Sequence, residues 1–353
     1  MEPWFSRTLI SWYNLNKRDL PWRYEKDPYL IWLSEVILQQ TQVAQGLAYY
    51  TRFTKRYPTV GRLAKAAEDD VLKLWQGLGY YSRARNLHCT AKVIHQEFKG
   101  VFPRKYENIR SLKGVGDYTA AAIASFAFNQ PYAVLDGNVY RVLSRVFGIE
   151  TPIDAPGAKK QFQELATDLL NKKNPAEHNQ AIMEFGSQYC KPVNPDCENC
   201  IFRNKCSAFR SRKVNDLPLK TKKIKIRDRF LNYLVVIDKN KKILINRRGG
   251  NDIWQGLYEF HLLETARDFS AKELFALKEF KKICGKNFSL LHISQRYKHI
   301  LTHQHLYAKF YVIRISGVFD SSQQTSDLKN LKKIAFSRLT EKFMTYCALK
   351  ELF

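Results

Sequence analysis

SLKGVGDYTAAAIASFAFNQPYAVLDGNVYR, residues 111–141, is the stretch around which the rest of the sequence is organised. Gly114 and Gly116 form a turn that leads into an Ala-rich run with high helix propensity. Paired glycines before a helix expose backbone N–H groups at its positive end, which suits one phosphate group, although a turn that only caps a helix has the same pattern. An apolar run then delivers one acid, Asp136, which Asn138 follows closely. A single carboxylate that follows a phosphate-binding turn is suited to chemistry on a sugar.

The composition predicts a folded, two-domain protein that binds a polyanion. The chain has 353 residues, of which 45% are hydrophobic, and this is enough for two separate cores. Its formal net charge of +25 indicates nucleic acid as the partner. No apolar run approaches the roughly 20 residues that span a bilayer, and the N-terminus lacks the pattern of a signal peptide. We therefore expect a cytoplasmic, nucleoid-associated protein of bacterial type with no membrane partner.

Residues 1 to about 110 have helical periodicity and contain a second candidate acid. The stretch YLIWLSEVILQQTQVAQGLAYYTRF predicts one buried face, formed by Val36, Leu38, Val43 and Leu47. Glu35 lies among apolar neighbours, so desolvation would raise the pKa of its carboxyl and make it a proton donor near neutral pH. A solvated glutamate on the outer face of a helix is the alternative.

Two polar stretches in this half are candidates for contacts with DNA. Gln39, Gln40 and Gln42 provide amides, which read base edges but are also common on helix surfaces. Residues 75–86, WQGLGYYSRARN, combine glycines, tyrosines and arginines. This combination suits a wedge in a base stack with arginines on the phosphates, or equally a core tyrosine beside surface arginines.

Four cysteines with the spacing C-x6-C-x2-C-x5-C form the most specific local pattern: Cys190, Cys197, Cys200 and Cys206. Thiolates select zinc, Cu(I) or iron–sulfur centres. Structural zinc sites more often have two close pairs separated by a longer loop, so the spacing favours an iron–sulfur cluster without excluding zinc.

A basic segment, residues 210–229, holds nine Lys or Arg residues against two Asp residues and marks the domain boundary. It is either a solvated spacer or a strap across a duplex. From residue 230 to residue 353, strand patterns rich in Val, Ile, Tyr and Phe predict an α+β domain with one helical segment over 271–283. The turn KHILTHQHL, residues 298–306, is interpreted as a polar loop rather than a metal site.

Several motifs together resemble a known family. LKGVG (residues 112–116), LDGN (residues 135–138) and the four-cysteine spacing resemble the helix-hairpin-helix DNA glycosylases with a [4Fe–4S] cluster. WLSEVILQQTQV, GLGYYSRARNL and a Nudix-like C-terminal part with LTH resemble the adenine DNA glycosylase branch, MutY type. The resemblance covers nearly the whole chain. It implies a mostly α-helical helix-hairpin-helix domain over residues 1–209 with a cluster loop at 190–206, and an α+β Nudix-like recognition domain over residues 230–353.

The resemblance also implies an activity: base excision repair by hydrolysis of the bond between the sugar and an adenine mispaired with 8-oxoguanine, or more weakly with guanine, in double-stranded DNA. Glu35 would protonate N7 of the adenine. Asp136 would stabilise the oxocarbenium-like sugar and help form a transient covalent state, and Asn138 would orient Asp136. Tyr118 and Glu184 would support the two acids. We expect the protein to act as a monomer.

Further roles follow from the same resemblance. Gln40 and Tyr80 would hold the opposite strand, and Thr302 and His303 would check for the oxidised guanine. The remaining predicted DNA-binding residues are Gly114, Gly116 and, in the DLPWR turn, Arg23. The ligands of the [4Fe–4S] cluster would be Cys190, Cys197, Cys200 and Cys206.

Two departures from related patterns refine the expectation. Relatives that also cut the strand, such as endonuclease III, carry a lysine where this chain has Tyr118, and some relatives carry a product-trapping lysine at the position of Tyr140. Because a Schiff base needs an amine, we expect a monofunctional glycosylase with at most weak lyase activity.

The Nudix-like part lacks the REXXEE glutamate pattern, so it should not hold catalytic Mg²⁺.

Three other functions compete with this interpretation. They are an endonuclease III-like glycosylase for oxidised pyrimidines, a non-catalytic DNA-binding or redox-sensing iron–sulfur protein, and a metal-dependent nucleotide hydrolase. Tyr118 and the second domain argue against the first, the pairing of Glu35 with Asp136 against the second, and the missing glutamates against the third.

Overall fold

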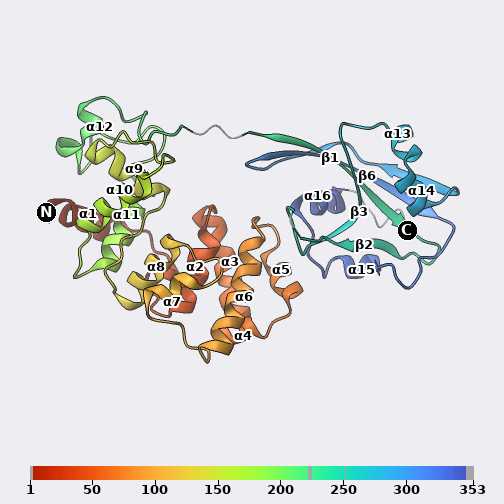
Figure 1. The fold of residues 1–353 in the computed structure, drawn as a ribbon, viewed down its shortest axis with the longest axis horizontal. Helices are drawn as coiled ribbons and strands as arrows, with labels where there is room; N and C mark the ends of the chain where they lie inside the picture. Colours follow the sequence, from red (N-terminus) through yellow and green to blue (C-terminus); the bar gives the residue numbers. More distant parts are fainter. Residues whose placement is uncertain (1–2, 222–224, 251, 347–353) are drawn as a thin grey trace. The chain divides into compact units, whose positions relative to one another are not determined.

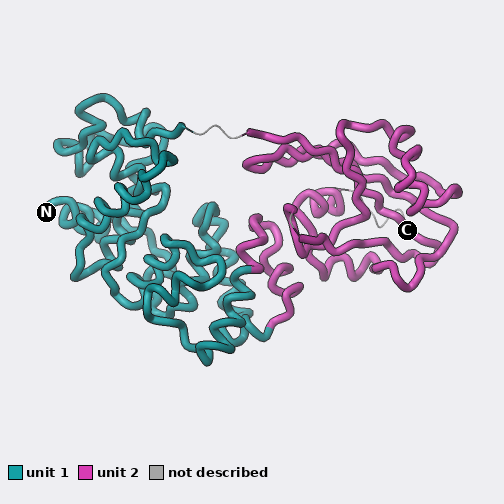
Figure 2. The backbone as a smooth tube through the Cα atoms, viewed as in Figure 1, with its two compact units in different colours: residues 1–65, 86–222 teal, residues 66–85, 223–353 magenta. Residues whose placement is uncertain are grey.

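The chain folds into two compact units, which a computed structural model describes over residues 3–221, 225–250 and 252–346 (Figure 2). Unit 1 comprises residues 1–65 and 86–222, and unit 2 comprises residues 66–85 and 223–353. A short segment from the N-terminal half of the sequence therefore belongs to the same unit as the C-terminal half.

Unit 1 is built from helices (Figure 1). They are α1 (Pro3–Asn16), the 3-10 helix η1 (Pro21–Arg23), α2 (Pro28–Leu38), α3 (Val43–Arg56), α4 (Val60–Ala64), α6 (Ser82–Glu97, whose first residues lie in unit 2), α7 (Tyr106–Ser111), α8 (Asp117–Phe128), α9 (Gly137–Phe147), α10 (Ala158–Leu169), α11 (Pro175–Gln188), η2 (Arg203–Lys205) and α12 (Ser207–Arg210). No helix that the structure describes is both long enough and apolar enough to cross a membrane.

Helix α8 is the centre of unit 1. It packs against α2, α7 and α11, and every side chain from Thr119 to Phe126 is buried. Half of these side chains are alanines, which favour the helix and allow neighbouring helices to approach closely. The Ala-rich run predicted to be helical thus forms the core around which the acid-bearing helices are arranged.

The acid at the end of the deciding stretch caps the next helix. Asp136 is the N-cap of α9, and its Oδ1 accepts a hydrogen bond of 2.8 Å from the backbone N–H of Val139. A carboxylate at a helix N-terminus also interacts favourably with the helix dipole. The helix ends at Gly148, which has the left-handed φ of 68° that glycine adopts without strain.

Unit 2 contains α5 (Glu68–Trp75) and a seven-stranded sheet of order β4-β6-β1-β3-β2-β7, with β5 paired to β6. The strands are β1 (Arg227–Ile237), β2 (Ile243–Arg247), β3 (Tyr258–Thr265), β4 (Phe288–Ile293), β5 (Tyr297–Ile300), β6 (Gln304–Ile315) and β7 (Thr325–Ser326). The helices are α13 (Ala271–Ala276), α14 (Lys278–Cys284), α15 (Leu328–Leu331) and α16 (Arg338–Tyr346). Strands β1 and β6 are parallel, and the other strand pairs are antiparallel.

Helices cover both faces of this sheet. Alternate residues of the central strand β1 point to opposite cores: Tyr233 lies in the core that includes Phe343 of α16, and Leu234 lies in the core that includes Phe280 of α14. A strand buried on both faces reads as a continuous apolar run, as LNYLVVI does here. The C-terminal part therefore has the predicted α+β architecture.

Two local predictions were wrong. In residues 29–53, Val36 is buried as expected, but Leu47 is 36% exposed, and Tyr50 and Phe53 are buried instead. The break between α2 and α3 shifts the phase of the helical pattern, so one continuous face does not form. The helical segment over 271–283 is two short helices, because Leu277 between them has an extended backbone.

The predicted basic linker, residues 210–229, is packed at both ends. Leu217 is buried in a small apolar cluster beside α12, and the Thr221 N–H donates a hydrogen bond of 3.0 Å to Asp154 Oδ1. The last three residues of the segment already belong to β1. Residues 222–224 of the predicted linker lie outside the described residues.

The contact between α11 and α9 generates a prediction about stability. A Cβ at Gly186 would lie 2.7 Å from Cβ of Asn138 and 3.1 Å from its carbonyl oxygen, so Gly186→Ala forces the two helices apart. We expect this variant to lose roughly 1–3 kcal/mol of unfolding free energy in urea titrations.

Gly61→Ala is the matched control. Gly61 lies on α4, and the nearest atom to an added Cβ is 3.5 Å away, an ordinary contact. Because alanine also has the higher helix propensity, this variant should be neutral or slightly more stable. Equal losses in the two variants would contradict the close approach of α11 and α9.

Candidate active site

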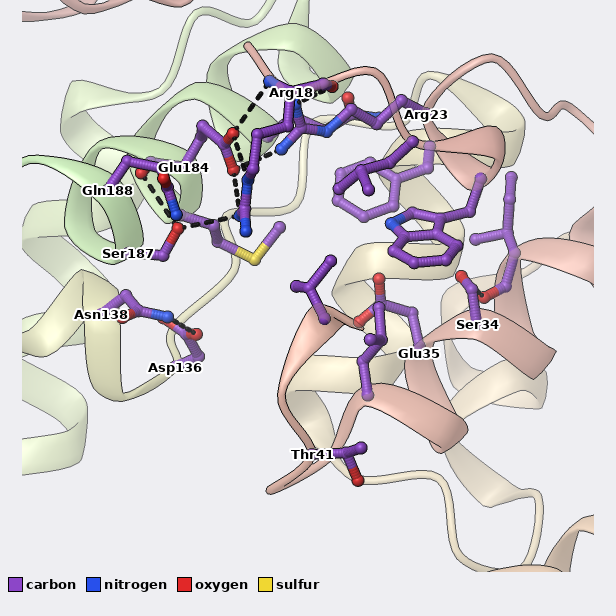
Figure 3. A pocket seen from close by; sticks show the side chains of 18 of the residues that line it. Arg18, Arg23, Ser34, Glu35, Thr41, Asp136, Asn138, Glu184, Ser187 and Gln188 are labelled. Atoms are coloured by element: carbon purple, nitrogen blue, oxygen red, sulfur yellow. Dashed lines mark hydrogen bonds and ion pairs between the residues drawn. The ribbon is translucent and has the colours of Figure 1, made fainter. Parts of the chain in front are cut away.

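A cavity of about 450 Å³ opens in unit 1 and collects the residues that the sequence predicted for catalysis (Figure 3). Side chains from η1, α2, α8, α9 and α11 line it. The predicted residues among them are Arg23, Glu35, Tyr118, Asp136, Asn138 and Glu184. Figure 3 shows Glu35 on one side of the cavity and Asp136 with Asn138 on the other. The two acids therefore face one shared space.

Glu35 is a buried acid with one hydrogen-bond donor. Its residue surface is 8% exposed, and the Tyr118 hydroxyl donates to its Oε2 over 2.7 Å. Burial raises the pKa of the Glu35 carboxyl to about 7, assisted by the charge of Asp136 and opposed by the Tyr118 hydrogen bond. The carboxyl can therefore hold a proton near neutral pH, as predicted from its apolar neighbours.

Asp136 is partly buried, and more donors surround it. Burial raises the pKa of its carboxyl, while the backbone N–H of Val139, the side chain and backbone of Asn138, and the charge of Arg141 act in the opposite direction. The Asn138 amide donates to Asp136 Oδ2 over 2.8 Å. The side-chain oxygen of Asn138 in turn accepts a hydrogen bond of 2.8 Å from Arg141. These contacts favour the ionised form of Asp136, whereas Glu35 has only the tyrosine.

A third acid, Glu184 on α11, is held by two arginines. Arg18 donates from Nε to Oε1 over 2.8 Å and from Nη2 to Oε2 over 2.6 Å, and Arg23 forms an ion pair with Oε2. Burial alone would raise the pKa of Glu184, but the hydrogen bonds from Arg18 and Arg23 outweigh it and lower the pKa. Glu184 is thus ionised and acts only as an acceptor. Arg23, predicted to contact DNA, lies in this cavity and not on the outer surface.

The four predicted metal-binding cysteines converge on a second, much smaller cavity of about 20 Å³. The backbone N–H of Phe202 donates to Cys200 Sγ over 3.4 Å, and the guanidinium of Arg145 lies 3.5 Å from Cys190 Sγ. Donors aimed at sulfur suit thiolates that carry negative charge in a cluster. Among the residues that the structure describes, no group of three or more His, Cys, Asp or Glu side chains is arranged to hold a metal ion.

The glycine turn before α8 has the geometry of a backbone clamp. Gly114 has a φ of 79°, and a Cβ there would lie 2.7 Å from Cβ of Asn86, so only glycine fits. Gly116 is the N-cap of α8 and provides no side-chain cap. Asp117, the first residue of the helix, forms ion pairs with Arg110 and Lys159 instead of capping it. The first N–H groups of α8 are therefore available to an anion.

The other predicted DNA-binding residues lie on exposed turns. Gln40 and Tyr80 both have left-handed backbones, with φ of 55° and 45°, which is uncommon for non-glycine residues. In unit 2, the Tyr80 hydroxyl lies 3.1 Å from the hydroxyl of Thr302, in the turn between β5 and β6. His303 follows in the same turn, and its carbonyl oxygen accepts a hydrogen bond of 3.0 Å from the Arg227 N–H. The structure therefore brings Tyr80 and Thr302 together.

Sequence reasoning missed three residues of the first cavity's surroundings. Arg18 pairs with Glu184 across 166 positions, and Arg141 links Asn138 to the carbonyl of Cys190 over 2.8 Å. The Tyr118 hydroxyl also lies 3.2 Å from Met183 Sδ. Of these three residues, only Arg141 could have been found from the sequence, because it lies three positions after Asn138 on the same face of the helix.

Comparison with known proteins identifies relatives of both parts. Residues 33–168 match the family described as HhH-GPD superfamily base excision DNA repair protein, and residues 232–346 match the NUDIX domain. The chain is 33% identical over 328 residues to the adenine DNA glycosylase of Buchnera aphidicola subsp. Baizongia pistaciae, covering 91% of this chain and 90% of that protein. It is 44% identical over 213 residues to the adenine DNA glycosylase of Homo sapiens, covering 58% of this chain and 39% of that protein. The structure of a thermostable thymine-DNA glycosylase matches 59% of this chain and 95% of its own, with a TM-score of 0.55 and 30% identity.

The raised pKa of Glu35 generates a prediction about stability and pH. Between the ordinary value of 4.5 and about 7, the folded protein holds a proton that the unfolded chain has released, so raising the pH favours unfolding. We expect the wild type to become less stable relative to Glu35→Gln over this window, by roughly 3 kcal/mol at most. Urea titrations across the window measure the difference.

Glu107→Gln is the control, because Glu107 is an exposed glutamate on α7 of the same unit. Its difference from the wild type should stay flat across the same pH range. A flat difference for Glu35→Gln as well would mean that the Glu35 carboxyl is not desolvated.

Proposed function

Because the chain belongs to the adenine DNA glycosylase family of base excision DNA repair proteins, we propose that it removes adenine mispaired with 8-oxoguanine or guanine in double-stranded DNA. The observation that supports this most strongly is the shared cavity, in which a buried acid with one donor, Glu35, faces a partly buried acid with several donors, Asp136. Chemistry on a base requires that the base leave the stack, which costs least at a mispair. The cavity would receive the extruded adenine nucleotide.

Glu35 is the proton donor of the proposed reaction. Adenine is a poor leaving group until it is protonated, and the pKa of about 7 lets Glu35 carry the proton at neutral pH. Transfer of this proton to N7 allows the C1′–N9 bond to break, with the electron pair going to N9. Adenine then leaves as the neutral base, and Glu35 is left as a carboxylate. Tyr118, hydrogen-bonded to Oε2, stabilises that carboxylate.

Asp136 stabilises the sugar. Bond cleavage leaves positive charge shared between C1′ and the ring oxygen, and an ionised carboxylate lowers the energy of that state. Asn138 and the Val139 N–H fix the orientation of this carboxylate. Water then adds to C1′ and releases a proton, which restores protonated Glu35 through solvent. The product is an abasic site. The two acids thus take opposite protonation states because their surroundings differ.

Glu184 is placed to select the base. Its ionised carboxylate, fixed by Arg18 and Arg23, accepts hydrogen bonds and cannot donate them. An exocyclic amine such as that of adenine is attracted to a negative acceptor of this kind, whereas a carbonyl at the same position places a second negative oxygen against it. Such mismatches are strongly disfavoured.

The same cavity favours hydrolysis without strand cutting. A lyase step through a Schiff base needs an amine nucleophile, and no lysine is among the described residues that line the cavity. Tyr118 provides a hydroxyl that is already donated to Glu35. We therefore propose a monofunctional enzyme with at most weak lyase activity.

We further propose that Cys190, Cys197, Cys200 and Cys206 hold a [4Fe–4S] cluster. The residues fit such a group: four sulfurs line one cavity, and donors from Phe202 and Arg145 point at two of them. When bound, the cluster would cross-link the loop of residues 190–206. Arg141 and Arg145 hold the carbonyls of this loop and so tie it to α9.

Glycosylase assays on duplexes with adenine opposite 8-oxoguanine, guanine or thymine, followed by alkali, test the proposed function. We expect cleavage opposite the first two and little opposite thymine. Glu35→Gln and Asp136→Asn should each lower the single-turnover rate by at least about 100-fold, while Glu107→Gln should not. The wild-type rate should fall as the pH rises through about 7, because Glu35 loses its proton. Equal cleavage at all three pairs would contradict the specificity.

Metal analysis and visible absorption test the cluster. The purified protein should contain iron and sulfide in equal amounts, and Cys200→Ser should lose both. Cys89→Ser is the matched control, because Cys89 is a free cysteine of the same unit outside the small cavity, and this variant should keep its iron. Bound zinc without iron would overturn the assignment.

A further inference from the structure

The segment Ala66–Arg85 belongs to unit 2, although it lies between two parts of unit 1 in the sequence. We propose that polar contacts centred on Arg247 hold this segment on the C-terminal domain and thereby position Tyr80 beside Thr302 as one surface for the base opposite the excised adenine. Only the last step of this proposal rests on the proposed function. The contacts, called here the Arg247 clasp, join Arg247, Gln255 and Tyr258 to Glu68, Asp69 and Arg85.

The first half of the clasp holds the acidic N-terminal turn of α5. Arg247 Nη2 lies 3.0 Å from Glu68 Oε1 and 3.0 Å from Asp69 Oδ1, and the Tyr258 hydroxyl donates to Asp69 Oδ2 over 3.1 Å. Arg247 ends β2 and Tyr258 begins β3, and these two residues are direct partners in the antiparallel ladder. The two arms of the clasp are therefore fixed relative to one another by the sheet.

The second half holds the other end of the segment. Arg85 donates to the carbonyl oxygen of Gln255 and, over 3.0 Å, to its side-chain oxygen. The neighbouring Gly256 has a φ of 82°, and a Cβ there would lie 3.3 Å from the Leu72 side chain. The backbone of this loop thus approaches α5 closely at a place where glycine is favoured.

Contacts inside the segment connect α5 to Tyr80. The Trp75 indole N–H, at the end of α5, donates to the carbonyl of Gly79 over 2.9 Å. The Arg83 guanidinium lies 5.1 Å from the Trp75 ring centroid and 5.6 Å from that of Tyr80. A displacement of α5 is therefore transmitted to the turn that carries Tyr80.

Tyr80 needs such support. It is 52% exposed and has a left-handed φ of 45°, a conformation that persists in a non-glycine residue only when its surroundings enforce it. Its hydroxyl lies 3.1 Å from that of Thr302. Two adjacent hydroxyls offer both donors and acceptors, which suits the edge of a base that differs from guanine by one added oxygen and one added N–H.

The clasp is built to be reversible. The side chains of Arg247, Glu68 and Asp69 are 45%, 41% and 42% exposed. Exposed ion pairs are individually weak and are screened by salt. Loss of these ion pairs leaves the C-terminal core intact, because its apolar clusters contain none of these three residues. Lys73 and Gln76 of the segment keep their own hydrogen bonds to the Ile334 carbonyl and to Glu341. Arg247 acts here as a positioning residue, because it reaches the opposite base only through α5 and Tyr80.

Arg247→Ala tests the proposal, with Arg267→Ala as the matched control. Arg267 is an exposed arginine of the same domain, paired with Glu273 over 2.7 Å and not with the segment. Hydrogen exchange of the α5 amides measures the clasp directly. The ratio of single-turnover excision rates opposite 8-oxoguanine and opposite guanine measures the position of Tyr80.

For Arg247→Ala we expect faster exchange over α5 and a fall in the rate ratio, each by roughly two- to tenfold, the range that one or two exposed ion pairs supply. Arg247→Lys should show smaller changes in both the exchange rate and the rate ratio, and Arg267→Ala should change neither. Unchanged exchange in Arg247→Ala would overturn the clasp. Faster exchange with an unchanged ratio would overturn the positioning of Tyr80. A wild type that does not distinguish the two opposite bases would instead refute the proposed function, while the exchange result would still decide the clasp.

Discussion

The function proposed for this protein depends on two carboxyl groups that line one cavity. Burial penalises the charged form of each, and the charge of Asp136 further raises the pKa of Glu35. The conflict is resolved by unequal donors: Glu35 receives one hydroxyl, whereas Asp136 receives the Val139 N–H and Asn138, with Arg141 behind them. These donors favour the ionised form of Asp136, whereas Glu35 has less support for its charged form. If both carboxyl groups had the same hydrogen-bond donors, one would not be favoured as the proton donor and the other as the carboxylate.

The fold gives the two carboxyl groups different donors because Asp136 also caps a helix. As the N-cap of α9 it must be an acceptor, and the helix N-terminus favours its ionised form. Glu35 lies in the last turn of α2, which packs against α8, and its carboxyl accepts the hydroxyl of Tyr118 and caps no helix. The different positions of the two acids along their helices thus decide their chemical roles before any substrate binds.

The sequence predicted the features that depend on local pattern. The glycine turn and the helical periodicity located the central helices, and Glu35 and Asp136 were found as acids in apolar runs. Features that depend on contacts between distant residues were not predictable in this way. No local signal links Arg18 to Glu184, or Arg247 to Glu68, because an ion pair needs only two compatible charges and the chain has 58 basic and 33 acidic residues to choose from.

The large positive charge does not select a substrate. Attraction of +25 to phosphates acts at every position of a duplex and so lowers the energy of bound DNA without favouring one base over another. Binding energy of this uniform kind does not accelerate a reaction. In the proposed function, selectivity comes from places where few groups meet one nucleotide. These are the cavity with its three acids for the base that leaves, and the hydroxyls of Tyr80 and Thr302 for the base that stays.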